Sequence, residues 1–144
     1  MNAFIKNIPA GTYYVGDPSY VFNDDSWAKI LEISNCFNTP HIEFKDKPII
    51  AFGTKSGDGV YNDFCVDAGL IGIVDISLIE EGSAFFNDNF DRQKHTVTFD
   101  KPFDFEWIEG DFYIGNQITI YTNDDNEYYD YDYEDEYEDE YEDE

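Results

Sequence analysis

The residues most suited to chemistry are four carboxylates near Gly-rich turns: Asp17, Asp58, Asp63 and Asp67. Several carboxylates at one place could coordinate a hard cation such as Ca²⁺ or Mg²⁺. Their spacing matches no EF-hand loop, however, and each lies in a different turn or strand of the chain. We therefore predict no metal site and no cofactor.

Catalytic patterns are weak throughout the chain. Residues 53–59 (Gly-Thr-Lys-Ser-Gly-Asp-Gly) lack the spacing of a phosphate-binding P-loop and are typical of a hairpin turn. His41 and His95 have no paired metal-ligand spacing, and no serine lies in a nucleophile elbow. Cys65 is expected within a strand, buried and inert. The sequence therefore predicts that the protein is not an enzyme.

The same region could instead bind a small molecule, such as a nucleotide signal. Lys55 and the backbone amides of Gly57 and Gly59 would supply donors for phosphate oxygens. The candidate ligand-binding residues are Asp17, Tyr20, Lys55, Asp58, Tyr61 and Asp67.

Residues 123–144 consist of Asp, Glu, Tyr and Asn. Such a segment cannot bury enough apolar surface to fold alone, so we expect it to be disordered in isolation. Its carboxylates could imitate nucleic-acid phosphates, and its tyrosines could stack where bases would; the alternative is a solubilising appendage. The residues expected to bind a partner are Asp130, Asp132, Glu134, Asp135, Glu136, Glu138, Asp139, Glu140, Tyr129, Tyr133 and Tyr137.

The charge distribution indicates the class of partner. The formal net charge is −25, and residues 124–144 hold 14 of the 33 acidic residues with no basic ones. The remaining 19 acidic residues still outnumber the 8 basic ones, so the body is acidic too. Direct nucleic-acid binding is disfavoured because it requires clustered Lys and Arg. A protein with a basic nucleic-acid-binding surface is the expected partner.

The cellular compartment is predicted from the cysteines and the N-terminus. Cys36 and Cys65 show no disulfide or zinc spacing, and we expect two buried thiols in a reducing cytosol, with a disulfide as the alternative. Residues 1–8 lack the pattern of a signal peptide, and no stretch is apolar enough for a membrane span. The protein is therefore expected in the cytoplasm.

The first half of the chain predicts mostly strands. Residues 3–8 and 11–15 are expected to form a hairpin, and 25–35 a helix capped by Asp24 or Asp25. A short strand is expected at 41–44. Residues 48–76 predict a β-meander at the centre of the sheet. Within it, Val60, Asn62, Phe64 and Val66 should share one face of a strand, and 70–74 should be an interior strand.

The second half of the chain begins with residues 81–94, which look irregular, with an edge hairpin as the alternative. Strands are then expected at 96–99, 103–108, 112–114 and 117–122, the second alternating between aromatic and mostly acidic residues. The predicted fold is mainly β (α+β): a small, bent antiparallel sheet, barrel- or sandwich-like, with one α-helix. The predicted domain organisation is a globular domain at 1–122 and an acidic tail at 123–144.

Three motifs support a family resemblance: Gly-Asp-Pro-Ser-Tyr at 16–20, Gly-Asp-Gly-Val-Tyr at 57–61 and Val-Asp-Ala-Gly-Leu-Ile-Gly at 66–72. With Trp27, they resemble small, mostly uncharacterised accessory proteins of bacteriophages and prophages over about residues 8–80. This resemblance implies a phage protein that acts in the host cytoplasm on defence or nucleic-acid enzymes, such as a nuclease, restriction complex or CRISPR-type effector. It implies no particular chemistry, and the oligomeric state stays open.

Overall fold

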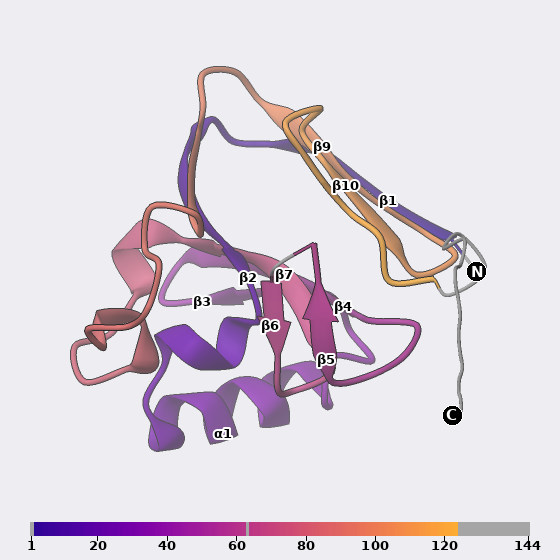
Figure 1. Cartoon of the computed structure of the whole chain (residues 1–144). Helices are drawn as coiled ribbons and strands as arrows, with labels where there is room; N and C mark the ends of the chain where they lie inside the picture. Colours follow the sequence, from indigo (N-terminus) through magenta and orange to yellow (C-terminus); the bar gives the residue numbers. More distant parts are fainter. Residues whose placement is uncertain (1, 63, 124–144) are drawn as a thin grey trace, which may run out of the picture.

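The computed structural model describes residues 2–62 and 64–123 (Figure 1). They confirm the predicted mainly β fold with one α-helix. The helical elements are α1 (Asp24–Ser34) and the short 3-10 turns η1 (Pro18–Val21), η2 (Ile76–Leu78) and η3 (Ala84–Phe86). The strands are β1 (Asn2–Ile8), β2 (Gly11–Gly16), β3 (His41–Phe44), β4 (Lys47–Gly53), β5 (Gly59–Tyr61), β6 (Phe64–Val66), β7 (Leu70–Asp75), β8 (Thr96–Phe99), β9 (Phe103–Ile108), β10 (Asp111–Ile114) and β11 (Ile118–Ile120).

All strand pairs are antiparallel, and they form three sheets. The central sheet has the order β3-β4-β7-β2-β8, and the outer sheet has the order β1-β9-β10-β11. Strands β5 and β6 form a separate hairpin. These sheets do not close into a barrel. The central and outer sheets instead share one core, so the sandwich-like alternative describes the fold.

The predicted N-terminal hairpin is wrong. Strand β1 pairs with β9 in the outer sheet, whereas β2 pairs with β7 and β8 in the central sheet (Figure 1). The chain crosses between the two sheets at Pro9, which has no amide hydrogen for a ladder. The Tyr13 hydroxyl donates to the Pro9 carbonyl at 2.8 Å and fixes this crossing.

The predicted central meander is only partly correct. Strand β7 lies in the middle of the central sheet, as expected for an interior strand, but its partners are β4 and β2. Residues 60–67 do not form one strand. Asn62 has a φ of 50°, a left-handed conformation that starts a tight turn, and Tyr61 pairs with Phe64 across it. This turn places β5 and β6 outside the central sheet.

The side chains of successive residues in the central sheet pack alternately into two different cores. The core between the central and outer sheets contains the buried residues Ile8, Tyr13, Val15, Ile50, Phe52, Phe64, Val66, Ile71, Ile73, Phe99, Phe103, Phe105, Phe112, Ile114 and Ile120. The core under α1 contains Tyr14, Val21, Phe22, Ile30, Phe37, Ile42, Phe44, Ile49, Ala51, Val74, Leu78 and Phe85. Successive side chains of a strand point to opposite faces, which explains this division.

Helix α1 lies within one residue of its predicted bounds, but its cap differs. The Asn23 side chain accepts from the Ser26 amide at 2.9 Å, so neither Asp24 nor Asp25 is the N-cap. The two aspartates lie in the first turn, where the helix dipole favours negative charge. Trp27 stacks on Phe22 and Phe37, and this contact holds the helix against its core.

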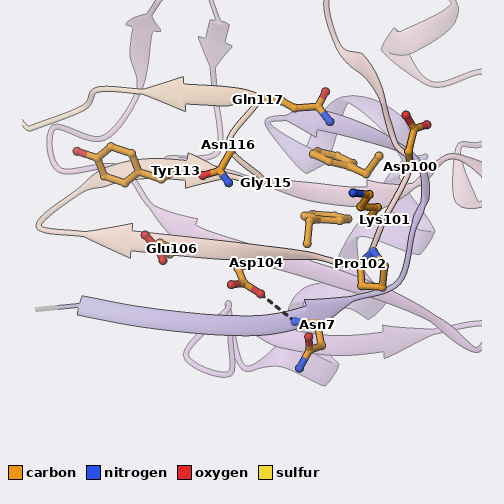
Figure 2. A pocket seen from close by; sticks show the side chains of 12 residues that line it. Asn7, Asp100, Lys101, Pro102, Asp104, Glu106, Tyr113, Gly115, Asn116 and Gln117 are labelled. Atoms are coloured by element: carbon orange, nitrogen blue, oxygen red, sulfur yellow. Dashed lines mark hydrogen bonds between the residues drawn. The ribbon is translucent and has the colours of Figure 1, made fainter.

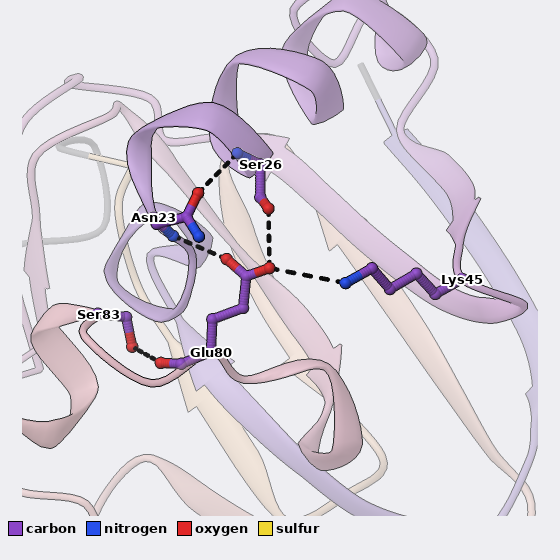
Figure 3. A network of polar contacts seen from close by, with 5 residues as sticks. All are labelled: Asn23, Ser26, Lys45, Glu80 and Ser83. Carbon is purple, nitrogen blue, oxygen red and sulfur yellow. Dashed lines mark hydrogen bonds and ion pairs between the residues drawn. The ribbon is translucent and has the colours of Figure 1, made fainter.

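A partly exposed polar network also holds the start of α1 (Figure 3). The Glu80 carboxylate accepts from the Asn23 amide at 2.9 Å and from the Ser26 hydroxyl at 2.7 Å. Lys45 Nζ lies 3.8 Å from the same carboxylate, but its side chain is 65% exposed, so the ion pair adds little stability. The network connects the helix to the segment after β7, and Glu80 therefore has a structural role.

The expectation of buried thiols is wrong. Cys36 and Cys65 are both exposed, and neither forms a disulfide. Cys36 follows the C-cap of α1, where the backbone has left-handed angles. Cys65 lies on β6 between the buried residues Phe64 and Val66, so alternation turns it outward. The irregular structure expected at 81–94 is confirmed, apart from the single turn η3.

Gly72 provides a stability test of the central sheet. A Cβ there would overlap the Ile50 carbonyl oxygen and lie 2.7 Å from the Ala51 Cα, so β4 and β7 would have to separate. We expect Gly72→Ala to lower the free energy of unfolding by about 3 kcal/mol. Gly82→Ala is the control: it meets no atom within 4 Å and suffers only its positive φ of 84°. It should cost about 1 kcal/mol.

The two variants would be compared by urea unfolding of the full chain. Equal losses of stability would show that the close approach of β4 to β7 is not a constraint.

Candidate functional site

The globular domain holds the chain as far as Asn123, the first residue of the predicted acidic tail. The backbone amides of Thr122 and Asn123 donate to the buried Asp111 carboxylate at 3.0 and 3.1 Å. The Asn123 side chain donates to the Glu109 carbonyl at 2.7 Å. All residues that we predicted to bind a partner come later, between 129 and 140, and lie outside the described residues.

The six predicted ligand-binding residues fall into two groups. Asp17, Tyr20 and Asp67 lie together, whereas Lys55, Asp58 and Tyr61 lie along the loop and strand before β6. In the second group the Tyr61 hydroxyl donates to the Gly57 carbonyl at 2.9 Å, and the Lys55 amide donates to the Thr122 hydroxyl at 2.9 Å. Lys55 and Asp58 are exposed. Of the six residues, Tyr20 lines a defined pocket.

Asp17 is fully buried, and its carboxylate connects two distant segments. Oδ1 accepts from the Ser19 amide at 2.9 Å and from the Ser19 hydroxyl at 2.7 Å. Oδ2 accepts from the Asp67 and Ala68 amides at 2.7 and 2.8 Å. Four donors fill the acceptor sites of a carboxylate. Asp17 therefore joins η1 to the turn before β7, and its carboxylate has no site left for a ligand.

Tyr20 and Asp67 form the second half of this cluster. The Tyr20 hydroxyl donates to Asp67 Oδ2 at 2.6 Å. Burial raises the pKa of Tyr20, and the hydrogen bond and the charge of Asp67 raise it further. Tyr20 thus remains a neutral phenol whose hydrogen is committed to Asp67. Its oxygen can still accept a hydrogen bond from a ligand.

A pocket of about 370 Å³ lies beside Tyr20, within the usual size range for small-molecule sites. We call it the His95 pocket. Its lining residues are Tyr20, Cys65, Ala84, Asn87, Asn89, Phe90, Asp91, Lys94 and His95. They come from η1, β6, η3 and the segment that follows η3. The pocket is therefore built from elements that are far apart in the sequence.

His95 is the buried polar residue of this pocket, with 6% of its surface exposed. Its ring lies parallel to Tyr14, with ring centres 5.4 Å apart, and 4.7 Å from the ring centre of Phe90. Its backbone carbonyl accepts from the Val15 amide at 2.8 Å. Gly16 makes room for the imidazole, since a Cβ there would lie 2.7 Å from Nδ1.

The hydrogen bonds of His95 determine its tautomer. Nδ1 lies 2.7 Å from the Val15 carbonyl oxygen, which cannot donate, so Nδ1 carries the hydrogen. Burial lowers the pKa of His95, and the bond to Val15 offsets this only in part. The ring is therefore neutral at pH 7, and Nε2 presents a lone pair. Nε2 has no hydrogen-bond partner within residues 2–62 and 64–123.

Sequence reasoning considered His95 as a metal ligand or as the base of a Ser-His-Asp triad, rejected both roles, and missed this environment. Its contacts to Val15 and Phe64 span 80 and 31 residues of sequence. No local motif marks them. The only available signal was the proximity of His95 to a strand, Thr96–Phe99, which pairs with β2.

A second candidate surface lies on the face of the outer sheet that points away from the core. Phe4 pairs with Glu106, Glu106 pairs with Tyr113, and Asp104 lies two residues along the same strand. Directly paired residues share a face, as do residues i and i+2. We call these four residues the acidic sheet face. Phe4 is 54% exposed.

A pocket of about 550 Å³ adjoins the acidic sheet face, and Figure 2 shows the side chains that line it. Three acids, Asp100, Asp104 and Glu106, and one cation, Lys101, contribute to its lining. Asp104 Oδ1 accepts from the Asn7 amide at 3.1 Å. The Glu106 carboxylate has no hydrogen bond or ion pair to another described residue. The surface thus presents three carboxylates beside an aromatic ring, with Lys101 as the cation of the same lining.

No protein-family model matches the chain, and neither a curated protein nor a solved structure shows significant similarity to it. In the part of the chain that the structure describes, no helix is long and apolar enough to cross a membrane.

Asp17 and Asp75 allow a matched test of the buried cluster. Each carboxylate accepts from the amide and hydroxyl of a serine two residues later, but only Asp17 also binds Asp67 and Ala68. Asp17→Ala leaves these partly buried donors without their acceptor and should lower the free energy of unfolding by about 3 kcal/mol. Asp75→Ala should cost about 1 kcal/mol. Thermal and urea unfolding would measure both, and equal costs would contradict the bridging role.

His95 predicts a pH dependence of stability. The pKa of His95 lies below its usual value of 6.5 in the folded state, so the unfolded chain binds the proton more readily. The free energy of unfolding should therefore fall as the pH drops from 6.5 through the folded pKa. In His95→Asn, which keeps a donor for the Val15 carbonyl, this component should disappear. Urea unfolding between pH 7 and pH 5 would measure the free energy of unfolding of both proteins. If it fell by the same amount with pH in the wild type and in His95→Asn, the prediction would be contradicted.

Proposed function

We propose that this protein is a phage-encoded, non-enzymatic inhibitor of host defence. It acts as an acidic DNA mimic: it binds the basic nucleic-acid-binding surface of a host protein in the host cytoplasm and blocks that surface. A nuclease, a restriction complex or a CRISPR-type effector is the proposed target. The observation that carries the proposal is the net charge of −25, of which residues 124–144 contribute 14 negative charges without a compensating base.

Electrostatics supports this class of partner. Surfaces that bind DNA carry Lys and Arg positioned for phosphates, and an acidic protein competes for the same cations. The attraction acts over about 8 Å at physiological salt, so it speeds encounter and falls as salt rises. The same charge repels nucleic acid, and we therefore propose no direct nucleic-acid ligand.

The acidic sheet face supports the proposal from within the globular domain. It combines the carboxylates of Asp104 and Glu106 with the rings of Phe4 and Tyr113, which resembles the composition of the tail. Carboxylates can accept from arginine in the manner of phosphate, and aromatic rings can stack on a guanidinium group. A partner could therefore contact both the sheet and the tail. Figure 2 shows Glu106 and Tyr113 on adjacent strands of this face.

The proposal predicts salt-sensitive capture of a nucleic-acid-binding protein. Full-length protein would be immobilised and exposed to host lysate at about 50 and 200 mM salt, conditions between which polyanion contacts weaken strongly. We expect capture at low salt, displacement by duplex DNA, and loss of capture when the chain ends at Asn123. That endpoint retains the hydrogen bonds of Asn123 to the domain.

A charge-matched pair tests the sheet face in the same assay. Asp104→Asn with Glu106→Gln should weaken capture several-fold more than Glu81→Gln with Asp88→Asn, which removes the same charge from exposed positions near η3. Equal weakening would assign the effect to net charge alone. Capture that resists salt and survives removal of residues 124–144 would contradict the DNA-mimic proposal.

A second candidate function is the binding of a small molecule. The specific observation in its favour is the His95 pocket, which contains Tyr20 from the predicted ligand-binding set.

A further inference from the structure

The structure assigns a ligand class to the His95 pocket that is independent of the proposed inhibitor function. We infer that the pocket binds a neutral, planar nitrogen heterocycle of the nucleobase type. The heterocycle donates an N–H hydrogen bond to His95 Nε2 and stacks on the Phe90 ring. Three features in and near the pocket lead to this class: a buried acceptor, an aromatic wall, and cations that already interact with other groups of the protein.

The buried acceptor is His95 Nε2. The imidazole is fixed through Nδ1 to the Val15 carbonyl and through its ring contact with Tyr14, so it cannot turn to satisfy Nε2 within the protein. A buried acceptor without a donor is unfavourable. A ligand that donates a hydrogen bond to Nε2 would remove this cost. An N–H group at the edge of a heterocycle is such a donor.

The wall of the pocket is aromatic. Phe90 is half-buried, lies 5.8 Å from the ring centre of Tyr20 in an edge-on arrangement, and is tilted by 33° against His95. Its ring is held in place by these neighbours and lines the pocket. Stacking of a base on an aromatic side chain is favourable for every base. This wall therefore favours a planar ligand.

The charged groups disfavour a phosphate. The Arg92 guanidinium donates to the Phe85 and Asn87 carbonyls at 3.1 and 3.2 Å. Lys94 Nζ lies 4.9 Å from the ring centre of Phe64. Both cations thus have protein partners.

Two carboxylates near the pocket further disfavour an anionic ligand. Asp91 lines the pocket, and Asp67 binds the Tyr20 hydroxyl that also lines it. An anionic ligand would meet these carboxylates, so a neutral base or nucleoside fits better than a nucleotide. The amides of Asn87 and Asn89, which line the pocket as well, offer both donors and acceptors for the polar edge of a base.

The full-length protein would be titrated with adenine, cytosine and uracil, each also as its nucleoside and its 5′-monophosphate. Isothermal calorimetry would give the affinity, and the nitrogen-15 resonance of His95 Nε2 would report the hydrogen bond. We expect saturable binding of at least one base or nucleoside, weaker binding of its monophosphate, and a shift of the Nε2 resonance.

Two variants test the contacts. His95→Asn retains a donor for the Val15 carbonyl but removes Nε2, and it should raise Kd about tenfold. Phe90→Leu retains apolar volume but removes the ring, and it should also raise Kd about tenfold. Phe86→Leu is the control, since Phe86 is 50% exposed on the same segment and does not line the pocket. Its Kd should not change.

The proposal is overturned if no base or nucleoside binds saturably at millimolar concentration. Preferential binding of a monophosphate would overturn the neutral class, and a Kd unaffected by Phe90→Leu would overturn the site. If His95→Asn fails to fold, the Kd of Phe90→Leu and the Nε2 resonance of the wild type still show whether the ligand binds in the His95 pocket. None of these results depends on the lysate capture, so the two proposals fail separately.

Discussion

The fold depends on the need to cover both faces of the central sheet. The side chains of Ile71 and Ile73 point to one face of β7, and the side chain of Val74 points to the other. All three side chains are fully buried. The outer sheet covers the first face, where Phe52 stacks on Trp107 with ring centres 5.0 Å apart. Helix α1 and the short turns cover the second face. A single five-stranded sheet would expose one of these apolar surfaces, so the chain has to cross between layers, and Pro9 marks the first crossing.

These crossings also create the candidate sites. Because β1 pairs in the outer sheet, its residue Phe4 lies opposite Glu106 on a surface that no other layer of residues 2–62 and 64–123 covers. Because the segment after η3 returns to pair β8 with β2, His95 comes to lie against Val15 and beside Tyr20. The Asp17 carboxylate then fixes the position of η1, and with it Tyr20, relative to the turn before β7. Strand pairing together with the Asp17 hydrogen bonds thus assembles both surfaces.

The two proposals invoke different physical interactions. In the proposed inhibitor, the acidic sheet face and the acidic residues of the tail would act through long-range charge, which salt screens and which discriminates mainly by sign. In the proposed ligand site, the His95 pocket would act through short-range stacking and a hydrogen bond to a buried acceptor, which salt affects little and which discriminates by shape. One small domain can therefore carry an electrostatic interface and a ligand pocket whose contributions are experimentally separable.

Local sequence patterns determined the elements that depend on near neighbours: the alternation of Phe103 to Ile108, the strand at 41–44 and the helix near 25–35 were all correctly predicted. Composition alone determined the acidic charge. Tertiary structure decided the pairing of β1 with β9 and of β4 with β7, because an apolar strand face is compatible with several partners, and only joint burial of all faces selects among them. The same reason applies to the site. The sequence included Tyr20 among the candidate ligand-binding residues, and that stays a prediction. The buried imidazole of His95 and the saturated carboxylate of Asp17 exist only because segments separated by 80 and 50 residues meet in the folded chain.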